Sequence, residues 1–176
     1  AIVDAKYLIN LDSENEGEIA VGCAGGIEVS ASCRAKADKA EGIPLKVSVS
    51  GLLGGHSGSE IHLERGNAIK ILARYLNRLP SFQIASFTGG TLHNVIPFSA
   101  EAVITVPDRD VALSIAGNLR KELENEFRES DPGLKFEVKD TEMPQAALKR
   151  KKSQKIADAL FCLPHGVRSR IPSMLD

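Results

Sequence analysis

The chain has 176 residues, of which 43% are hydrophobic, and its formal net charge at pH 7 is −1. This length and apolar content are enough for one globular domain or one and a fraction. No apolar run approaches the roughly 20 residues that span a bilayer, and the balanced charge gives no electrostatic reason to expect a nucleic-acid partner.

The first predicted elements are strands. Residues 5–12 (AKYLINLD) form a nearly continuous apolar run that ends at Asp12, as in a strand covered on both faces. Residues 19–35 are rich in β-branched residues and interrupted by glycine, which predicts strands with a bend at Gly25-Gly26. Residues 36–44 then become polar and contain glycine and proline, which indicates a domain boundary.

Beyond this boundary, strand and helix patterns follow one another. Strands are predicted where apolar residues follow a strand pattern, at residues 43–52, 82–90, 99–107 and 134–142. Helices are predicted where apolar residues recur at helical spacing, at about 60–79, at 110–130 and at about 153–162. The order β-α-β-β-α-β is that of a ferredoxin-like unit, an antiparallel sheet with two helices on one face. We therefore predict an α+β fold.

Charged residues mark two of the helix ends. Asp108 or Asp110 lies near the start of the helix predicted at 110–130, and the sequence Asp131-Pro132-Gly133 ends it. The basic run at residues 149–152 is interpreted as the solvated start of the last helix and not as a binding patch.

The cysteines indicate the compartment. Cys23, Cys33 and Cys162 are scattered, with no CxxC pair and no histidine partner at zinc-site spacing. The first residues, AIVDAKYLIN, also lack the basic and long apolar stretches of a signal peptide. Reduced thiols are typical of the cytosol, so we expect a cytoplasmic protein with no membrane partner.

Asp12 is the first candidate for chemistry. It lies at the carboxyl end of a predicted strand, the edge where α/β sheets build ligand and metal sites. A turn or cap aspartate is the alternative. One carboxylate supplies one ligand, whereas a catalytic zinc needs about three from the protein, so this segment cannot complete a metal site by itself.

His56 is the second candidate, because it lies in the glycine-rich sequence GGHSG between a strand and a helix. Such a turn lets the backbone approach a ligand closely while it exposes the side chain. The alternative is that Ser57 or Ser59 caps the helix and His56 points into water.

Asn94 is the third candidate and lies in the link between the second and third strands of the ferredoxin-like unit. Its amide offers a donor and an acceptor, which suits recognition of a peptide group or a carboxylate. Loop asparagines also serve as turn residues. We interpret His62, His93 and His165 as structural or surface residues.

Together these stretches resemble the bacterial aminoacyl-histidine dipeptidases, which are carnosinase-like two-zinc exopeptidases. The matching segments occur in the family's order, as LINLDSENEGEIAVGCAGG, GLLGGHSGSEIHLERGNAIKIL and GGTLHNVIP. Such enzymes have a catalytic α/β domain with two metal ions and an inserted lid domain that often serves dimerisation. The resemblance implies that residues 1–35 end a catalytic-domain segment and that residues 45–176 are part of the lid.

The resemblance also implies roles for single residues. Asp12 corresponds to a carboxylate that ligates one zinc, His56 to the lid histidine that reaches the scissile carbonyl, and Asn94 to the lid asparagine that holds the substrate. It implies two zinc ions, with cobalt or manganese as alternatives, an Xaa-His dipeptide substrate, and a homodimer formed through the lid.

The family's other metal ligands, its paired glutamates and its lid arginine have no counterparts in this sequence. We therefore expect the chain to be part of a longer protein and to be inactive by itself. The alternative function is a stand-alone ferredoxin-like module that binds a small molecule or another chain, because the fold does not determine the function.

Overall fold

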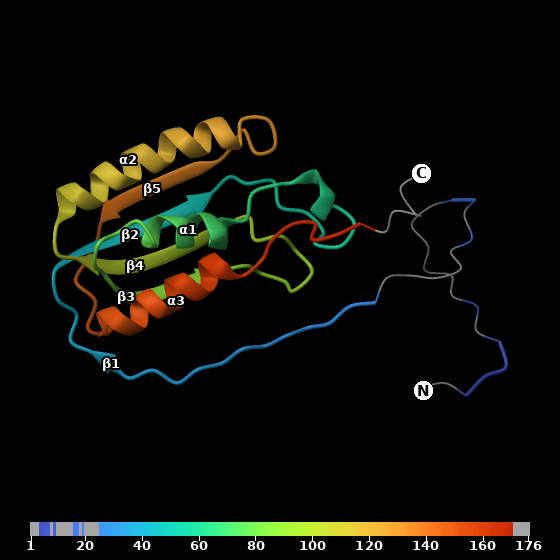
Figure 1. The fold of residues 1–176 in the computed structure, drawn as a ribbon, viewed down its shortest axis with the longest axis horizontal. Helices are drawn as coiled ribbons and strands as arrows, with labels where there is room; N and C mark the ends of the chain where they lie inside the picture. Colours follow the sequence, from blue (N-terminus) through green and yellow to red (C-terminus); the bar gives the residue numbers. More distant parts are fainter. Residues whose placement is uncertain (1–3, 8, 10–15, 18, 20–24, 171–176) are drawn as a thin grey trace. The chain divides into compact units, whose positions relative to one another are not determined.

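Figure 1 shows the protein in a computed structural model, which describes residues 4–7, 9, 16–17, 19 and 25–170. The chain divides into two units, residues 1–34 and 35–176. In the first unit, Asp12 and residues 8, 10 and 11 of the strand predicted at 5–12 lie outside the described residues, and the described residues 5–7 and 9 form no strand. No helix within the described parts of the chain is long and apolar enough to cross a membrane.

The predicted strand after the bend at Gly25-Gly26 is not present. Residues 25–34 form no strand, although their β-branched composition favours one. A strand needs a neighbour to accept and donate its backbone hydrogen bonds. None of the described residues of the first unit provides such a neighbour, so composition alone is not sufficient here.

The second unit contains a four-stranded antiparallel sheet of order β3-β4-β2-β5. Its strands are β2 (Ile43–Ser50), β3 (Gln83–Gly89), β4 (Ala100–Val106) and β5 (Lys135–Asp140). With helices after β2 and after β4, this is the ferredoxin-like β-α-β-β-α-β arrangement, which confirms the predicted fold class.

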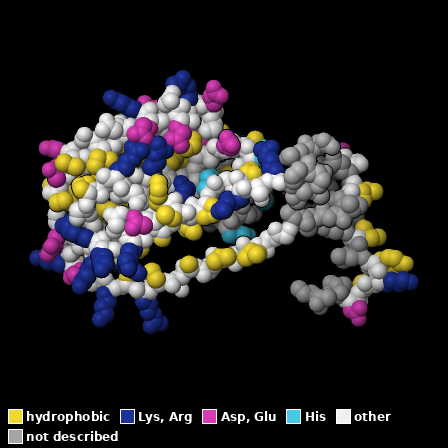
Figure 2. Space-filling model, viewed as in Figure 1, with side chains coloured by type: hydrophobic (Ala, Val, Ile, Leu, Met, Phe, Trp, Pro, Cys, Tyr) yellow, Lys and Arg dark blue, Asp and Glu magenta, His cyan; other side chains and the backbone are white. Residues whose placement is uncertain are grey.

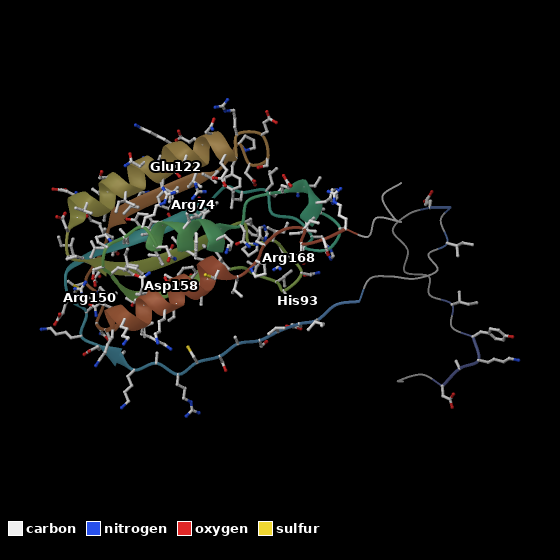
Figure 3. The ribbon with its side chains drawn as sticks, in the orientation of Figure 1. Arg74, His93, Glu122, Arg150, Asp158 and Arg168 are labelled. Atoms are coloured by element: carbon white, nitrogen blue, oxygen red, sulfur yellow. The ribbon has the colours of Figure 1, made fainter. Side chains whose placement is uncertain are left out.

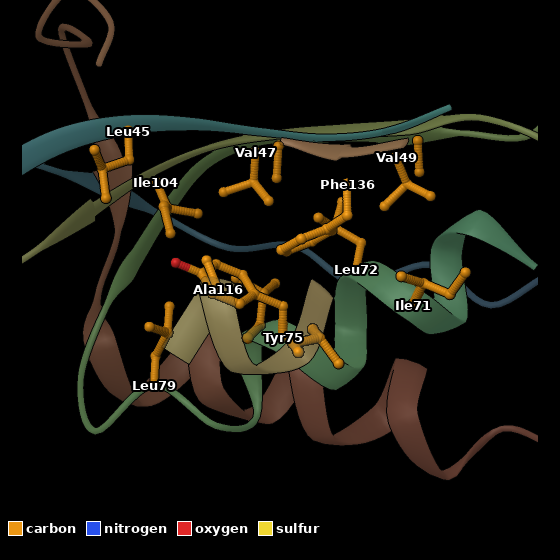
Figure 4. Packing of buried hydrophobic residues seen from close by; sticks show 14 of the residues in the cluster. Leu45, Val47, Val49, Ile71, Leu72, Tyr75, Leu79, Ile104, Ala116 and Phe136 are labelled. Carbon is orange, nitrogen blue, oxygen red and sulfur yellow. The ribbon is translucent and has the colours of Figure 1, made fainter. Parts of the chain in front are cut away.

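Among the described residues, three helices and one short 3₁₀ helix accompany the sheet. They are η1 (Ile61–Leu63), α1 (Ala68–Leu76), α2 (Arg109–Glu126) and α3 (Arg150–Cys162). Figure 4 shows α1 and α2 on the same side of the sheet, and α3 packs against α1 and β3. The basic run at 149–152 does start the last helix, as predicted.

The first long helix begins later than the apolar pattern predicts. Glu64 has a left-handed backbone conformation, with φ of 54°, which ends the 3₁₀ turn before it. The side chain of Asn67 then accepts hydrogen bonds from the backbone N–H groups of Ile69 and Lys70 and caps α1. In α2, Asp108 is the capping residue of the two aspartates considered.

The core lies between the sheet and the helices. Leu45, Val47 and Val49 alternate along β2 and are buried against α1 and α2. Tyr75 of α1 stacks edge to face on Phe136, with ring centroids 5.3 Å apart. Its hydroxyl donates to the carbonyl oxygen of Ala112 in α2 at 3.1 Å, and burial raises the pKa of Tyr75.

A second, two-stranded sheet joins β1 (Ala37–Asp38) to β6 (Ala147–Leu148). The buried side chain of Gln83 supports this sheet, because its Nε2 donates to the carbonyl oxygens of Lys39 and Leu148. Its Oε1 accepts the N–H of Glu41 at 2.8 Å. Specific hydrogen bonds therefore hold the polar stretch before β2 in place within the second unit.

An ion-pair network links α1 to α2 (Figure 3). Glu122 accepts from Arg78 at 2.8 Å through both oxygens and from Arg74 at 2.8 Å. The hydrogen bonds from Arg78 and then from Arg74 lower the pKa of Glu122 to about 2. The carboxylate is exposed, so solvent screens these pairs.

We expect Glu122→Gln to destabilise the chain at neutral pH and to have little effect near pH 2. A carboxylate whose pKa is lowered by folding stabilises the fold above its unfolded pKa, and that contribution disappears as the pH falls toward 2. Urea midpoints at pH 7, 4.5 and 3 measure the difference from wild type. Glu124→Gln, in the same helix but with no ion pair among the described residues, is the control. A difference that is the same at all three pH values contradicts the assignment.

Candidate functional site

Two loops at one end of the four-stranded sheet carry the candidate residues. The first follows β2 and contains His56, and the second joins β3 to β4 and contains Asn94. β2 and β3 both run antiparallel to β4, so the carboxyl ends of β2 and β3 lie at the same end of the sheet. Figure 2 shows histidine side chains at the surface of this end.

Backbone hydrogen bonds join the two loops directly. The N–H of Ser57 donates to the carbonyl oxygen of Asn94 at 2.8 Å, and the N–H of Ile96 donates to that of Gly55 at 2.8 Å. His56 and Val95 consequently form an antiparallel bridge between the loops. The fold thus brings His56 and Asn94, both exposed, to adjacent positions.

The imidazole of His56 is held by its own loop. Its Nδ1 lies 3.1 Å from the backbone nitrogens of both Gly58 and Ser59, which donate to it. An acceptor nitrogen carries no proton, so in the neutral ring the proton is on Nε2. The exposed ring therefore presents Nε2–H as a hydrogen-bond donor. The serine cap of the alternative interpretation is wrong, since Asn67 caps α1 and neither Ser57 nor Ser59 caps a helix. The exposure of His56 in that interpretation agrees with the structure.

Glu60 and Arg65 hold the backbone around His56. Oε2 of Glu60 accepts the His56 N–H at 2.7 Å, and Oε1 lies 3.0 Å from Nη1 of Arg65. The same Nη1 donates to the carbonyl oxygen of Gly54 at 2.8 Å. The hydrogen bond from His56 is the main cause that lowers the pKa of Glu60, followed by Arg65. The ionised form of Glu60 is the one that accepts both bonds.

Close contacts explain why glycine occupies two positions of GGHSG. Gly55 has a φ of +129°, and a Cβ at this position would lie 2.6 Å from Nη1 of Arg65 and 2.9 Å from Oε2 of Glu60. A Cβ at Gly58 would lie 3.1 Å from Cε1 of His56. A larger residue at Gly55 would therefore strain the backbone and displace the Arg65 and Glu60 side chains that support the histidine.

Asp131 is a residue that the sequence marked only as part of a helix stop. Its carboxylate is 1% exposed and accepts the N–H of Leu53 at 2.8 Å and that of Gly66 at 2.7 Å. These two residues flank the His56 loop. No spacing pattern could have revealed the contact, because the partners are 78 and 65 residues away along the chain.

A hollow of about 450 Å³ opens beside the two loops. Its lining includes Ser57 from the first loop, Leu92 and His93 from the second, and His165 after α3; His93 is labelled in Figure 3. His165 lies 3.3 Å from the amide nitrogen of Asn67. His62 is exposed on η1.

The described residues do not form a metal site. Among them, no group of three or more histidine, cysteine, aspartate and glutamate side chains could hold a metal ion. Asp12, the predicted metal ligand, lies outside the described residues. The two loops offer a hydrogen-bond donor at His56 and an amide at Asn94, beside a hollow.

Comparison with known proteins gives matches to a family, to a relative of known sequence and to solved structures. Residues 47–133 match the peptidase dimerisation domain. The chain is 38% identical over 175 residues to the cytosol non-specific dipeptidase of Escherichia coli strain K12, and the match covers 94% of this chain and 36% of that protein. The crystal structure of aminoacylhistidine dipeptidase from Vibrio alginolyticus matches 79% of this chain and 29% of its own, with a TM-score of 0.72 and 26% identity. The chain thus spans about a third of the length of these relatives.

Proposed function

Since the chain belongs to the M20 dipeptidases and residues 47–133 form their peptidase dimerisation domain, we propose that it is part of a metal-dependent dipeptidase that hydrolyses Xaa-His dipeptides such as carnosine. In this proposal the described residues belong to the lid, which binds the substrate and stabilises the reacting carbonyl group. The homodimer expected for such a lid and a cytoplasmic location are parts of the same proposal.

The fixed orientation of His56 is the observation that supports this role. When water attacks a peptide carbonyl, the carbon becomes tetrahedral and negative charge develops on the oxygen. A donor placed in advance stabilises that oxygen and is commonly worth roughly 10²- to 10³-fold in rate. Two backbone N–H groups occupy Nδ1 of His56, so its Nε2–H is available to donate to the oxygen.

Asn94 supplies the second part of the proposed site. The backbone carbonyl oxygen of Asn94 accepts a hydrogen bond from the N–H of Ser57, so the position of the Asn94 backbone follows that of the His56 loop. The side-chain amide can donate to a carboxylate and accept from an N–H group. This suits a dipeptide, which carries both groups close to the scissile bond.

The proposal also includes metal ions. Peptidases of this family are generally metal-dependent, and the resemblance implies two zinc ions, with cobalt or manganese as alternatives. We propose Asp12 as the one ligand that this chain contributes. The described residues do not form a metal site, so no role is assigned to them in metal binding.

The proposal predicts that the full-length parent protein cleaves β-alanyl-histidine in a metal-dependent manner, whereas the 176-residue chain cleaves no dipeptide. The chain contains a single expected metal ligand, and a catalytic zinc needs about three. Chromatographic detection of the released amino acids measures the reaction, with and without a chelator. Alanyl-alanine, which lacks histidine, tests whether the substrate class is limited to Xaa-His.

Equilibrium dialysis separates this proposal from the alternative of a stand-alone binding module. The module predicts tight binding of a dipeptide by the chain alone, without metal. The peptidase proposal predicts weak binding by the chain and metal-dependent binding by the parent. Cleavage of β-alanyl-histidine by the purified chain would contradict the proposed division of the site.

A further inference from the structure

We propose that Asp131 is a positioning residue that sets the orientation of the His56 imidazole, although it does not contact His56. Its carboxylate closes the loop that carries the histidine, and the Glu60–Arg65 pair transmits this closure to the histidine backbone. The catalytic consequence of this inference rests on the proposed function. The structural consequence does not.

The first step is the closure itself. Asp131 is 1% exposed, and each carboxylate oxygen accepts one backbone N–H, Oδ1 from Leu53 and Oδ2 from Gly66. A buried carboxylate is costly unless it is hydrogen-bonded, and bonds to an ionised acceptor are stronger than neutral ones. The Asp131 side chain thereby fixes both ends of the loop formed by residues 53–66.

The second step concerns the side-chain contacts inside the loop. Leu53 precedes Gly54 and Gly66 follows Arg65, so closure at Asp131 places the Arg65 side chain beside the Gly54 carbonyl. Nη1 of Arg65 then reaches Glu60, and Glu60 accepts the His56 N–H. Each contact in this series depends on the one closer to Asp131.

The third step explains why a carboxylate is required. Both partners of Asp131 are N–H donors, and each uses a different oxygen. Asparagine has nearly the same shape but replaces one oxygen with an NH₂ group, which would oppose one of the donors. Asp131→Asn should therefore release one end of the loop without creating a cavity.

The chain contains a matched control for this substitution. Asp108 caps α2, but there both N–H donors, from Asp110 and Val111, bind the same oxygen, Oδ1. An asparagine can supply that oxygen, and asparagine is a good capping residue. Asp108→Asn should therefore change neither the fold nor His56.

The test is the tautomer of His56 in the 176-residue chain, measured from the imidazole nitrogen shifts of ¹⁵N-histidine-labelled protein at a pH where the ring is neutral. Wild type and Asp108→Asn are expected to hold the proton on Nε2. Asp131→Asn is expected to give a mixture of tautomers, with amide exchange of Gly58 and Ser59 accelerated by about tenfold. Unchanged exchange of the β2 and β4 amides shows that the fold is intact.

A single Nε2-protonated tautomer in a folded Asp131→Asn chain overturns the inference. If this variant does not fold, amide exchange of the wild-type chain provides the test. Because the Asp131 carboxylate accepts from both N–H groups, the amides of Leu53 and Gly66 should be protected to a similar degree. Similar protection of the two amides supports the inference, and independent exchange overturns it. None of these outcomes requires peptidase activity.

In the full-length parent, Asp131→Asn is expected to lower kcat by about tenfold with KM nearly unchanged, since a misplaced donor affects the transition state more than substrate binding. A parent protein without dipeptidase activity would contradict the proposed function and leave the tautomer result standing. An active parent with unchanged kcat in this variant would overturn the catalytic consequence of the positioning role.

Discussion

Replacing His56 by asparagine in the full-length parent is expected to lower kcat for dipeptide hydrolysis by roughly 10²- to 10³-fold. The asparagine side chain can place an oxygen near the position of Nδ1, so it can still accept from the N–H groups of Gly58 and Ser59. It has no group that reaches the position of Nε2. The substitution thus removes the proposed donor and keeps the turn.

His56→Ala removes both functions of the imidazole and completes the comparison. Its kcat should fall as far as that of the asparagine variant, but it should also lose about 1 kcal/mol of stability, because the turn loses its cap. His62→Ala is the control, since His62 is exposed on η1 and has no proposed role. Steady-state kinetics and urea denaturation provide both measurements. A His56→Asn enzyme with full kcat would exclude the donor role.

The features that the sequence predicted well are local ones. The alternation of Leu45, Val47 and Val49 identifies β2, because the period of a strand depends only on near neighbours. Asp108 signals the start of α2 for the same reason, since its partners are two and three residues away. Once such elements were identified, their order was sufficient to predict the ferredoxin-like arrangement.

The start of α1 shows where local patterns mislead. Ile61 fits the apolar spacing of the helix, yet it belongs to a separate 3₁₀ turn. The interruption comes from the left-handed conformation of Glu64 and from the N-terminal cap that Asn67 provides. Apolar periodicity does not report either feature. The prediction therefore started the helix at about residue 60, in the later part of the loop that carries His56, whereas α1 begins at Ala68.

The candidate site was predicted by its exposed residues and not by its supports. GGHSG and Asn94 stand out in the sequence because they interrupt regular patterns, and the fold places them on adjacent loops. Asp131 and the Glu60–Arg65 pair act through contacts that only the folded chain creates. Sequence reasoning therefore identified the proposed catalytic group and could not identify what orients it.

Gly51→Ala is expected to destabilise the chain by roughly 2–4 kcal/mol, the largest loss that we expect from a change of one methyl group. Gly51 follows β2 with a φ of +78°, and a Cβ there would lie 2.0 Å from the carbonyl oxygen of Gly133. The left-handed conformation costs a residue with a Cβ about 1–2 kcal/mol. The remainder comes from moving two backbone segments apart.

This close approach also brings the Asp131 carboxylate to the His56 loop. Gly133 lies two residues after Asp131, and a Cβ at Gly133 would lie 2.8 Å from the Gly51 carbonyl oxygen. Gly51→Ala should therefore displace Asp131 from Leu53 and expose the Leu53 amide to exchange, in addition to lowering the urea midpoint.

Gly117→Ala is the matched control, because a Cβ at Gly117 in α2 meets nothing within 4 Å. That change should stabilise the chain by about 0.5–1 kcal/mol. Equal urea midpoints for the two variants would mean that the turn at Gly133 yields without cost, and that the contact between residues 51 and 133 does not hold Asp131 in place.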